Sequence, residues 1–424
     1  MNKSNEITKH LQKFINNKQK MNKTEIQRFQ NFSPSTKNIL KHFYKQINQS
    51  YHKFHSIQDK ITYKEIDFSD TKNLGVSYNY IPEDIKTEIN KSDKVGRIYS
   101  FKLTKRIIHL SIILPYDTKK VNIQQRNVQK MISQEFYNIV QKVYMWLCVV
   151  ESYAHCGCSK TMSIYIILTD CIKTLPGVLG KEIGRINANT AFTTSCNEES
   201  EIHIYRSEEF FKVLIHETMH NLGLDFSSMN EQITTPKIKE LFPIKSNDLR
   251  IYESYCEMWA EIINVIFYVY FTSNINTKNN IDKIMKKIED CLYYESQWSI
   301  YQCSKILHFY NLKYEDMYDK SPSVSVLRNE RYKEGETHVL AYYIIKSFLM
   351  FNINEFLEWC KKSNENILNF EKNSTTLHSY CNLIKSLHNS PIFLENTHII
   401  EEWMKDKNTN IMSSNSLRMS IHEF

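Results

Sequence analysis

The chain of 424 residues lacks several features that would place it in a large class of proteins. It has no Gly-rich phosphate-binding loop, and glycine and proline number only 8 each, far below the usual share. The most apolar stretch, Met258–Phe271, is short for a membrane span of about 20 residues and contains Glu261, so we expect a buried helix and no transmembrane segment. A helix-rich fold would explain the scarce glycine and proline, but the bias of an AT-rich genome explains them better, because Asn, Lys, Ile and Tyr abound.

The ten cysteines form no framework of regular spacings. Several lie in apolar segments, as Cys148 does, which is typical of reduced thiols in a reducing compartment. The first residues include no apolar core of about 7–15 residues, so secretion by a signal peptide is not expected. We therefore expect an intracellular protein, in the cytoplasm of a host or producing cell or in a virion. Composition favours a large DNA virus of the nucleocytoplasmic kind or an AT-rich intracellular parasite as its source.

The net charge of +7 is concentrated near the N-terminus, because residues 1–60 carry 12 Lys and Arg against three acids. Such a segment is either a solvated face of polar helices or an arm that binds an anionic partner, such as nucleic acid, an anionic membrane or an acidic protein. Pro34 should break these helices, because proline disfavours helical conformation at the residue before it.

The pattern of apolar residues after residue 60 predicts a mixture of strands and helices. Residues 97–116 are rich in β-branched and aromatic side chains and predict one long strand or a tight hairpin. A helix is expected over residues 122–152, and strands over 162–169, 190–194 and 201–205. Ser207 is the expected N-cap of the next helix. Beyond about residue 280 the pattern is mostly helical, and the polar stretch 408–420 predicts a loose tail.

The segment 213–226 contains the motif His216-Glu217-x-x-His220. Residues four apart share a face of an α-helix, so both imidazoles can bind one tetrahedral zinc ion. Glu217 would take a proton from the zinc-bound water and pass it to the departing amine. The helix should end near Gly223, which can adopt the left-handed conformation. The alternative is a buried helix whose two histidines bond to carbonyls or carboxylates.

A catalytic zinc normally has three protein ligands and one open position, so the motif needs a third ligand. The pattern His-Glu-x-x-His-x-x-Gly-x-x-His fails at its last position, Phe226, and leaves Asp225 one residue off register. A second helix, expected over 253–264, places Glu253, Glu257 and Glu261 on one face. Glu257 as a ligand and Glu261 as an acceptor for a histidine N–H would account for these acids. A solvent-facing acidic stripe is the alternative.

Taken together, the two motifs resemble those of the gluzincin metallopeptidases. The segment Glu257-Met-Trp-Ala-Glu261 resembles the third-ligand helix of the anthrax lethal-factor type, whereas Cys256 and Ala260 depart from the thermolysin-like Asn-Glu-x-x-Ser-Asp form. The resemblance covers about 50 residues, from 213 to 264. It implies zinc as the cofactor, with His216, His220 and Glu257 as its ligands and Glu217 as the general base. Glu261 would be a carboxylate that accepts a hydrogen bond from a ligand histidine.

The group that would stabilise the oxyanion is left open by the sequence. Enzymes of the lethal-factor type place a tyrosine upstream of the ligand glutamate, and both Tyr252 and Tyr255 are available, of which we name Tyr255. His338, with its neighbour Tyr342, is a further candidate, although a polar residue on a core helix is the alternative.

Two further segments carry weaker signals. His155-Cys156-Gly157-Cys158 holds three soft metal ligands in four residues but has no matching second pair. Residues 187–194 could form an edge strand that pairs with an extended substrate, or an ordinary edge.

We therefore expect an α+β fold. A zincin-like metallopeptidase domain (61–275) would follow a basic helical N-terminal segment (1–60) and precede a mostly helical C-terminal lobe with a polar tail (276–424). The expected function is that of a zinc-dependent endopeptidase, a hydrolase acting on a peptide or protein substrate. One rival is a non-catalytic zincin-fold scaffold or binding protein with a basic N-terminal arm. The other is a metzincin-like hydrolase that uses Asp225.

Overall fold

The computed structural model describes residues Lys9, Lys13, 32–68, 75–91, 93–116, 126–274, Lys278, 280–405 and 415–424. The chain divides into two compact units. The sheet unit comprises His42–Ile172 and Asn189–Asp225, and the helical unit comprises Met1–Lys41, Lys173–Ala188 and Phe226–Phe424. Of the predicted basic segment 1–60, residues 1–8, 10–12 and 14–31 lie outside the described residues, and the predicted limits 61–275 and 276–424 stay a prediction.

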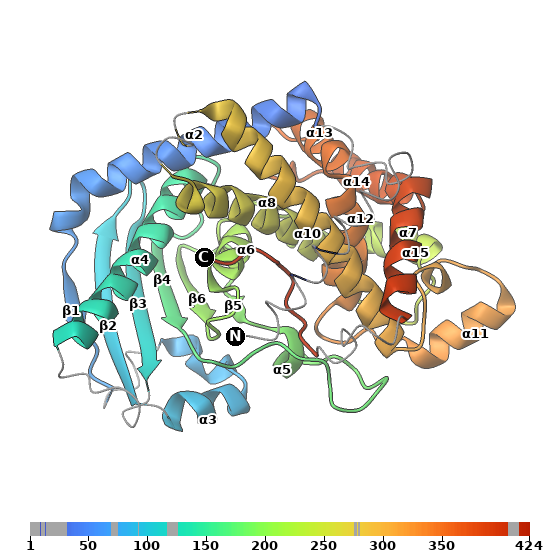
Figure 1. Ribbon diagram of the computed structural model, residues 1–424, viewed down its shortest axis with the longest axis horizontal. Coiled ribbons are helices and arrows are strands. Elements are labelled where there is room, and N and C mark those ends of the chain that lie inside the picture. Colours follow the sequence, from blue (N-terminus) through green and yellow to red (C-terminus); the bar gives the residue numbers. More distant parts are fainter. Residues whose placement is uncertain are drawn as a thin grey trace. The chain divides into compact units, whose positions relative to one another are not determined.

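The sheet unit is built on a mixed six-stranded sheet of order β1-β2-β3-β4-β6-β5 (Figure 1). The strands β3, β4 and β6 run parallel, whereas β1, β2 and β5 pair antiparallel with their neighbours. The expected α+β class is confirmed, and the residues around 97–116 form the hairpin rather than one long strand. The strand bounds are β1 Tyr63–Glu65, β2 Asp93–Lys102, β3 Ile107–Tyr116, β4 Thr161–Ile167, β5 Ala191–Thr193 and β6 Glu199–Ile204.

Helices cover both faces of this sheet, which is why the central strand β3 has an almost continuous apolar sequence. On one face, Tyr144 of α4 (Arg126–Val150) packs on Phe101 of β2, and Phe54 of α2 (Pro34–Ile57) packs on Tyr144. On the other face, Ile85 of α3 (Glu83–Lys91) belongs to a buried cluster with Ile113 of β3. Short helical turns, η1 (Gln58–Lys60) and η3 (Val76–Tyr80), lie between these elements.

The helical unit confirms the expectation of helices beyond residue 280. Its long helices α8 and α10 contact each other and α12. The stretch 258–271 lies within α8 and is buried, as expected, except that Tyr268 and Phe271 are half-buried. No helix among the described residues is long and apolar enough to cross a membrane. The bounds are α5 Arg185–Ala188, η4 Glu231–Ile233, α7 Thr235–Leu241, α8 Tyr252–Thr272, α10 Ile281–Phe309, η5 Glu315–Met317, α11 Pro322–Arg331, the π-helical η6 Leu340–Ile345, α12 Lys346–Phe351, α13 Ile353–Ser363, α14 Ser374–Leu387 and α15 Pro391–Lys405.

The expectation of a loose C-terminal tail is wrong for residues 415–420, and residues 408–414 lie outside the described residues. Ser420 is fully buried, and its hydroxyl donates to a carboxylate oxygen of Glu295 on α10 at 2.7 Å. The backbone N–H groups of Ile421 and His422 donate to the same carboxylate. A buried carboxylate needs hydrogen-bond donors, and the polar tail supplies them from a distant part of the sequence.

Candidate metal centre

The helix α6 (Phe210–Asn221) carries the His-Glu-x-x-His motif and packs against β5, β6 and α4. Leu214, Ile215 and Met219 are fully buried, and the indole N–H of Trp146 on α4 donates to the Thr218 hydroxyl at 2.7 Å. The expected N-cap is wrong. The helix begins after Glu209, which adopts a left-handed backbone conformation with φ of 59°, and no side chain caps it.

The two histidines of the motif point at each other. His216 is 4% exposed, and its Nε2 lies 3.1 Å from the Nε2 of His220. Two nitrogens that each bind a tetrahedral zinc at about 2.0–2.1 Å are about 3.4 Å apart. The spacing of four residues thus brings both nitrogens close to the separation that one zinc ion requires.

The turn that ends α6 returns an acidic side chain to His220. Gly223 has φ of 66°, its N–H donates to the His220 carbonyl, and the Leu224 N–H donates to the Met219 carbonyl. These two bonds form a Schellman motif, which confirms the expected stop at Gly223. Asp225, two residues after Gly223, is 2% exposed, and its carboxylate lies 2.5 Å from His220 Nδ1. A carboxylate on Nδ1 fixes the ring and turns Nε2 into the free electron-pair donor.

A buried asparagine anchors the end of α6 to the sheet edge. The Asn221 amide donates to the Thr193 hydroxyl at 3.0 Å, at the end of β5, and its Oδ1 accepts from Ser159 at 2.6 Å and Ser200 at 3.1 Å. The strand β5 pairs with β6 at the edge of the sheet. The helix that bears the histidines is therefore fixed to the strand at which an extended peptide could be added. Sequence reasoning missed Asn221, although it directly follows His220.

The general base expected from the motif, Glu217, lies on α6 between the histidines and is 9% exposed. Groups of histidine, cysteine and acidic side chains whose ligand atoms lie within 4.8 Å of one another occur in the structure, so metal binding is compatible with the donor set. The identity of the metal that such a group would bind can be inferred only from the chemical type of its ligands.

The three acids on α8 in the helical unit are buried, so the alternative of a solvent-facing stripe is wrong. Glu253 is 8%, Glu257 1% and Glu261 0% exposed. Glu261 pairs with the buried Lys346 of α12 at 2.8 Å, a partner that sequence reasoning missed. The predicted roles of Glu257 as a metal ligand and of Glu261 as a hydrogen-bond acceptor for a ligand histidine stay predictions.

Tyr255 lies in an aromatic core of the helical unit. It is fully buried, its hydroxyl donates to the Leu368 carbonyl at 3.2 Å, and that oxygen accepts from the Asn364 amide at 3.0 Å. Burial raises the pKa of Tyr255 well above its ordinary value. These contacts give Tyr255 a structural role and lend no support to its expected role as an oxyanion donor.

His338 lies two residues before η6 in a strained conformation, with φ of 46°. It is 5% exposed, and its Nδ1 has no hydrogen-bond partner among the described residues. Burial, followed by the positive charge of Arg250, lowers the pKa of His338, so the imidazole is neutral at pH 7. One turn later, Tyr342 donates its hydroxyl to Glu253 at 2.7 Å. Ser159, Glu209, Arg250 and Asn311 also have a positive φ, so the expected role of His338 as an oxyanion donor stays a prediction.

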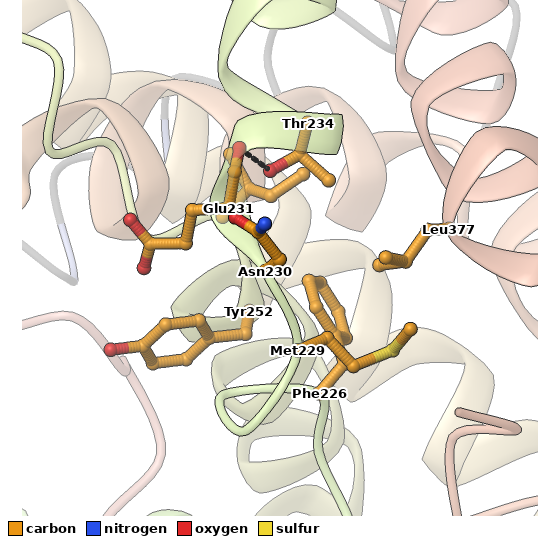
Figure 2. A pocket seen from close by; sticks show the side chains of 8 residues that line it. Phe226, Met229, Asn230, Glu231, Thr234, Tyr252 and Leu377 are labelled. Carbon is orange, nitrogen blue, oxygen red and sulfur yellow. Dashed lines mark hydrogen bonds between the residues drawn. The ribbon is translucent and has the colours of Figure 1, made fainter. Parts of the chain in front are cut away.

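A small pocket lies in the segment that follows Asp225. Figure 2 shows Tyr252 and Glu231 on one side of this pocket and Phe226, Met229 and Leu377 on the other. Even when the open solvent at its mouth is included, its empty space is only about 210 Å³, below the range of about 300–1,000 Å³ that is typical of small-molecule sites. We therefore assign no ligand to it.

Comparison with known proteins found a relative that matches only part of this chain. The chain is 26% identical over 200 residues to Uncharacterized protein R210 of Acanthamoeba polyphaga mimivirus, a match covering 46% of this chain and 47% of the relative. The chain thus spans about half the length of the curated relative it matches. No family model and no solved structure match. The viral relative accords with the source expected from composition, whereas the expected compartment stays a prediction.

Proposed function

We propose that the protein is a zinc-dependent peptidase whose metal is held by His216 and His220 of α6 and by a carboxylate of α8. The observation that carries this proposal is the geometry of the two imidazoles. Their Nε2 atoms lie 3.1 Å apart, and the Nδ1 of His220 is occupied by the Asp225 carboxylate. Without a metal, only one ring can donate to the other at this contact, whereas a zinc ion would use both nitrogens as ligands.

The third ligand is proposed from the sequence, with two candidates on α8. The family resemblance favours Glu257. Glu253 is the competing candidate, because its carboxylate is buried and is held by the Tyr342 hydroxyl at 2.7 Å. Carboxylates that bind metals are typically fixed by such hydrogen bonds. The two candidates are distinguished by which substitution removes the zinc.

The chain's own groups would then perform peptide hydrolysis. Bound zinc would supply a Lewis acid and acidify a water molecule. Glu217 would accept the proton of that water and deliver it to the leaving amine. The edge strand β5 would bind the substrate backbone by strand addition. His338 stays our proposed donor to the oxyanion on the grounds of the sequence alone.

The proposal is tested by measuring zinc content and hydrolysis of a denatured protein substrate in wild type, Glu217→Gln, Glu253→Gln and Glu257→Gln. We expect one zinc in the wild type, and zinc retained without activity in Glu217→Gln. We expect a loss of zinc in one of the two α8 variants and not in the other. Stoichiometric zinc without hydrolysis in the wild type would favour the non-catalytic scaffold. Folded wild type that binds no zinc would refute the proposal.

A further inference from the structure

The segment His155–Cys158 contains soft metal ligands, and the structure supplies the partner that the sequence left missing. Cys158 forms a disulfide with Cys196, 38 residues later, which corrects the expectation of reduced thiols for these two cysteines. The ligand atoms of His155, Cys158 and Cys196 lie within 4.8 Å of one another. Two cysteines and a histidine are a ligand set typical of zinc. We propose that reduction of this disulfide opens a second zinc site, held by His155, Cys158 and Cys196.

The surroundings of the cluster hold its ligands in place. Arg106 is 3% exposed and donates to the carbonyl groups of His155 at 2.9 Å and Cys158 at 3.2 Å. The Gly157 N–H donates to His155 Nδ1 at 3.2 Å, a bond that the ring would exchange for the metal, because a neutral imidazole has only one nitrogen with a free lone pair. Two further nitrogens of Arg106, Nε and Nη1, have no hydrogen-bond partner among the described residues. A buried guanidinium with unused donors, bound to the Cys158 backbone, favours the thiolate form of Cys158 after reduction, and the thiolate is the form that binds zinc.

A thiol reductant such as glutathione can reduce the Cys158–Cys196 disulfide in two balanced steps. A reductant thiolate attacks the sulfur of the exposed Cys196, the S–S bond breaks, and Cys158 leaves as a thiolate beside Arg106. A second reductant thiolate then releases Cys196 and forms the reductant disulfide, so two electrons pass to the protein. In a zinc complex the two sulfurs would stand about 3.8 Å apart, so the disulfide and the metal exclude each other.

This site adjoins the end of α6 but does not depend on the proposed peptidase. The His155 N–H donates to the carbonyl of Leu222, the last residue before the Gly223 turn, and Ser159 bonds to Asn221. Exchange of the disulfide for a metal therefore takes place next to the residues that orient His220. The site nevertheless uses none of the ligands of the proposed α6 centre, and the two can be tested separately.

The test uses full-length protein with the double substitution His216→Ala/His220→Ala, which removes the α6 centre. We expect this variant to bind one zinc after reduction and none after oxidation. Cobalt in place of zinc should give the thiolate-to-metal charge-transfer absorption that a site without sulfur ligands cannot produce. Adding Cys196→Ser should abolish both signals, whereas the matched control Cys156→Ser, a thiol in the same turn outside the cluster, should keep them.

A second measurement covers the case in which a variant does not fold. In reduced protein with intact ligands, bound zinc should protect Cys158 and Cys196 from alkylation, as read by mass spectrometry of the peptides. Equal alkylation with and without zinc, or equal zinc binding by the Cys196→Ser variant, would overturn the inference. Zinc bound by oxidised wild type but not by the reduced double variant would refute this site and leave the α6 centre intact.

Discussion

The hydrogen bond between Asp225 and His220 yields the sharpest test of the candidate metal centre. Asp225 is 2% exposed and lies 2.5 Å from the Nδ1 of His220. The substitution Asp225→Asn keeps the shape of the side chain and removes its negative charge. Loss of a carboxylate behind a ligand histidine typically lowers metal affinity by about 10–100-fold, which corresponds to about 1.4–2.7 kcal/mol. We therefore expect weaker zinc binding, with a site that still fills at high zinc concentration.

The assay is competition with a chelator of known zinc affinity, at a pH where the wild type binds fully. The matched control is Asp170→Asn, an exposed acid of the same unit, which should leave the affinity unchanged. Unchanged affinity in Asp225→Asn would refute the idea that this carboxylate strengthens His220 as a zinc ligand. Complete loss of zinc, combined with tolerance of Glu253→Gln and Glu257→Gln, would make Asp225 a direct ligand, as the metzincin-like rival requires.

Three further predictions concern stability. Gly223→Ala should cost about 1–2 kcal/mol in urea unfolding because φ is 66° there, whereas Gly177→Ala, which meets no atom within 4 Å, should change little. Lys346→Met should cost about 3–5 kcal/mol because it leaves the Glu261 carboxylate buried without its cation, and the double variant with Glu261→Met should recover most of this loss. Burial lowers the pKa of His422 in the folded protein to about 4, below the unfolded value of about 6.5, so only the unfolded chain gains a proton between these two pH values. Stability should fall by at most about 3 kcal/mol between pH 6.5 and 4, and His422→Gln should remove this part of the pH dependence in thermal unfolding.

The features that the sequence predicted correctly depend on residues close together in the chain. The histidines of α6 lie four apart, and Gly223 follows them closely, so helix period and backbone preference suffice to place them. The features it missed depend on contacts over long sequence separations. Cys196 lies 38 residues after Cys158, and the partner of Glu261 is Lys346 on another helix. No periodicity connects such residues, and many other pairings would satisfy the same composition.

The end of α6 shows how local and long-range constraints meet at one place. The Schellman turn at Gly223 is dictated by neighbouring residues, and it returns Asp225 to His220. Asn221 is the last residue of α6 and is held by Thr193, and the carbonyl of the next residue, Leu222, accepts from the His155 N–H. Both partners come from distant parts of the sheet unit. Any change that loosens this helix end should therefore disturb the direction of the His220 ring as well as fold stability, because the same few backbone positions set both.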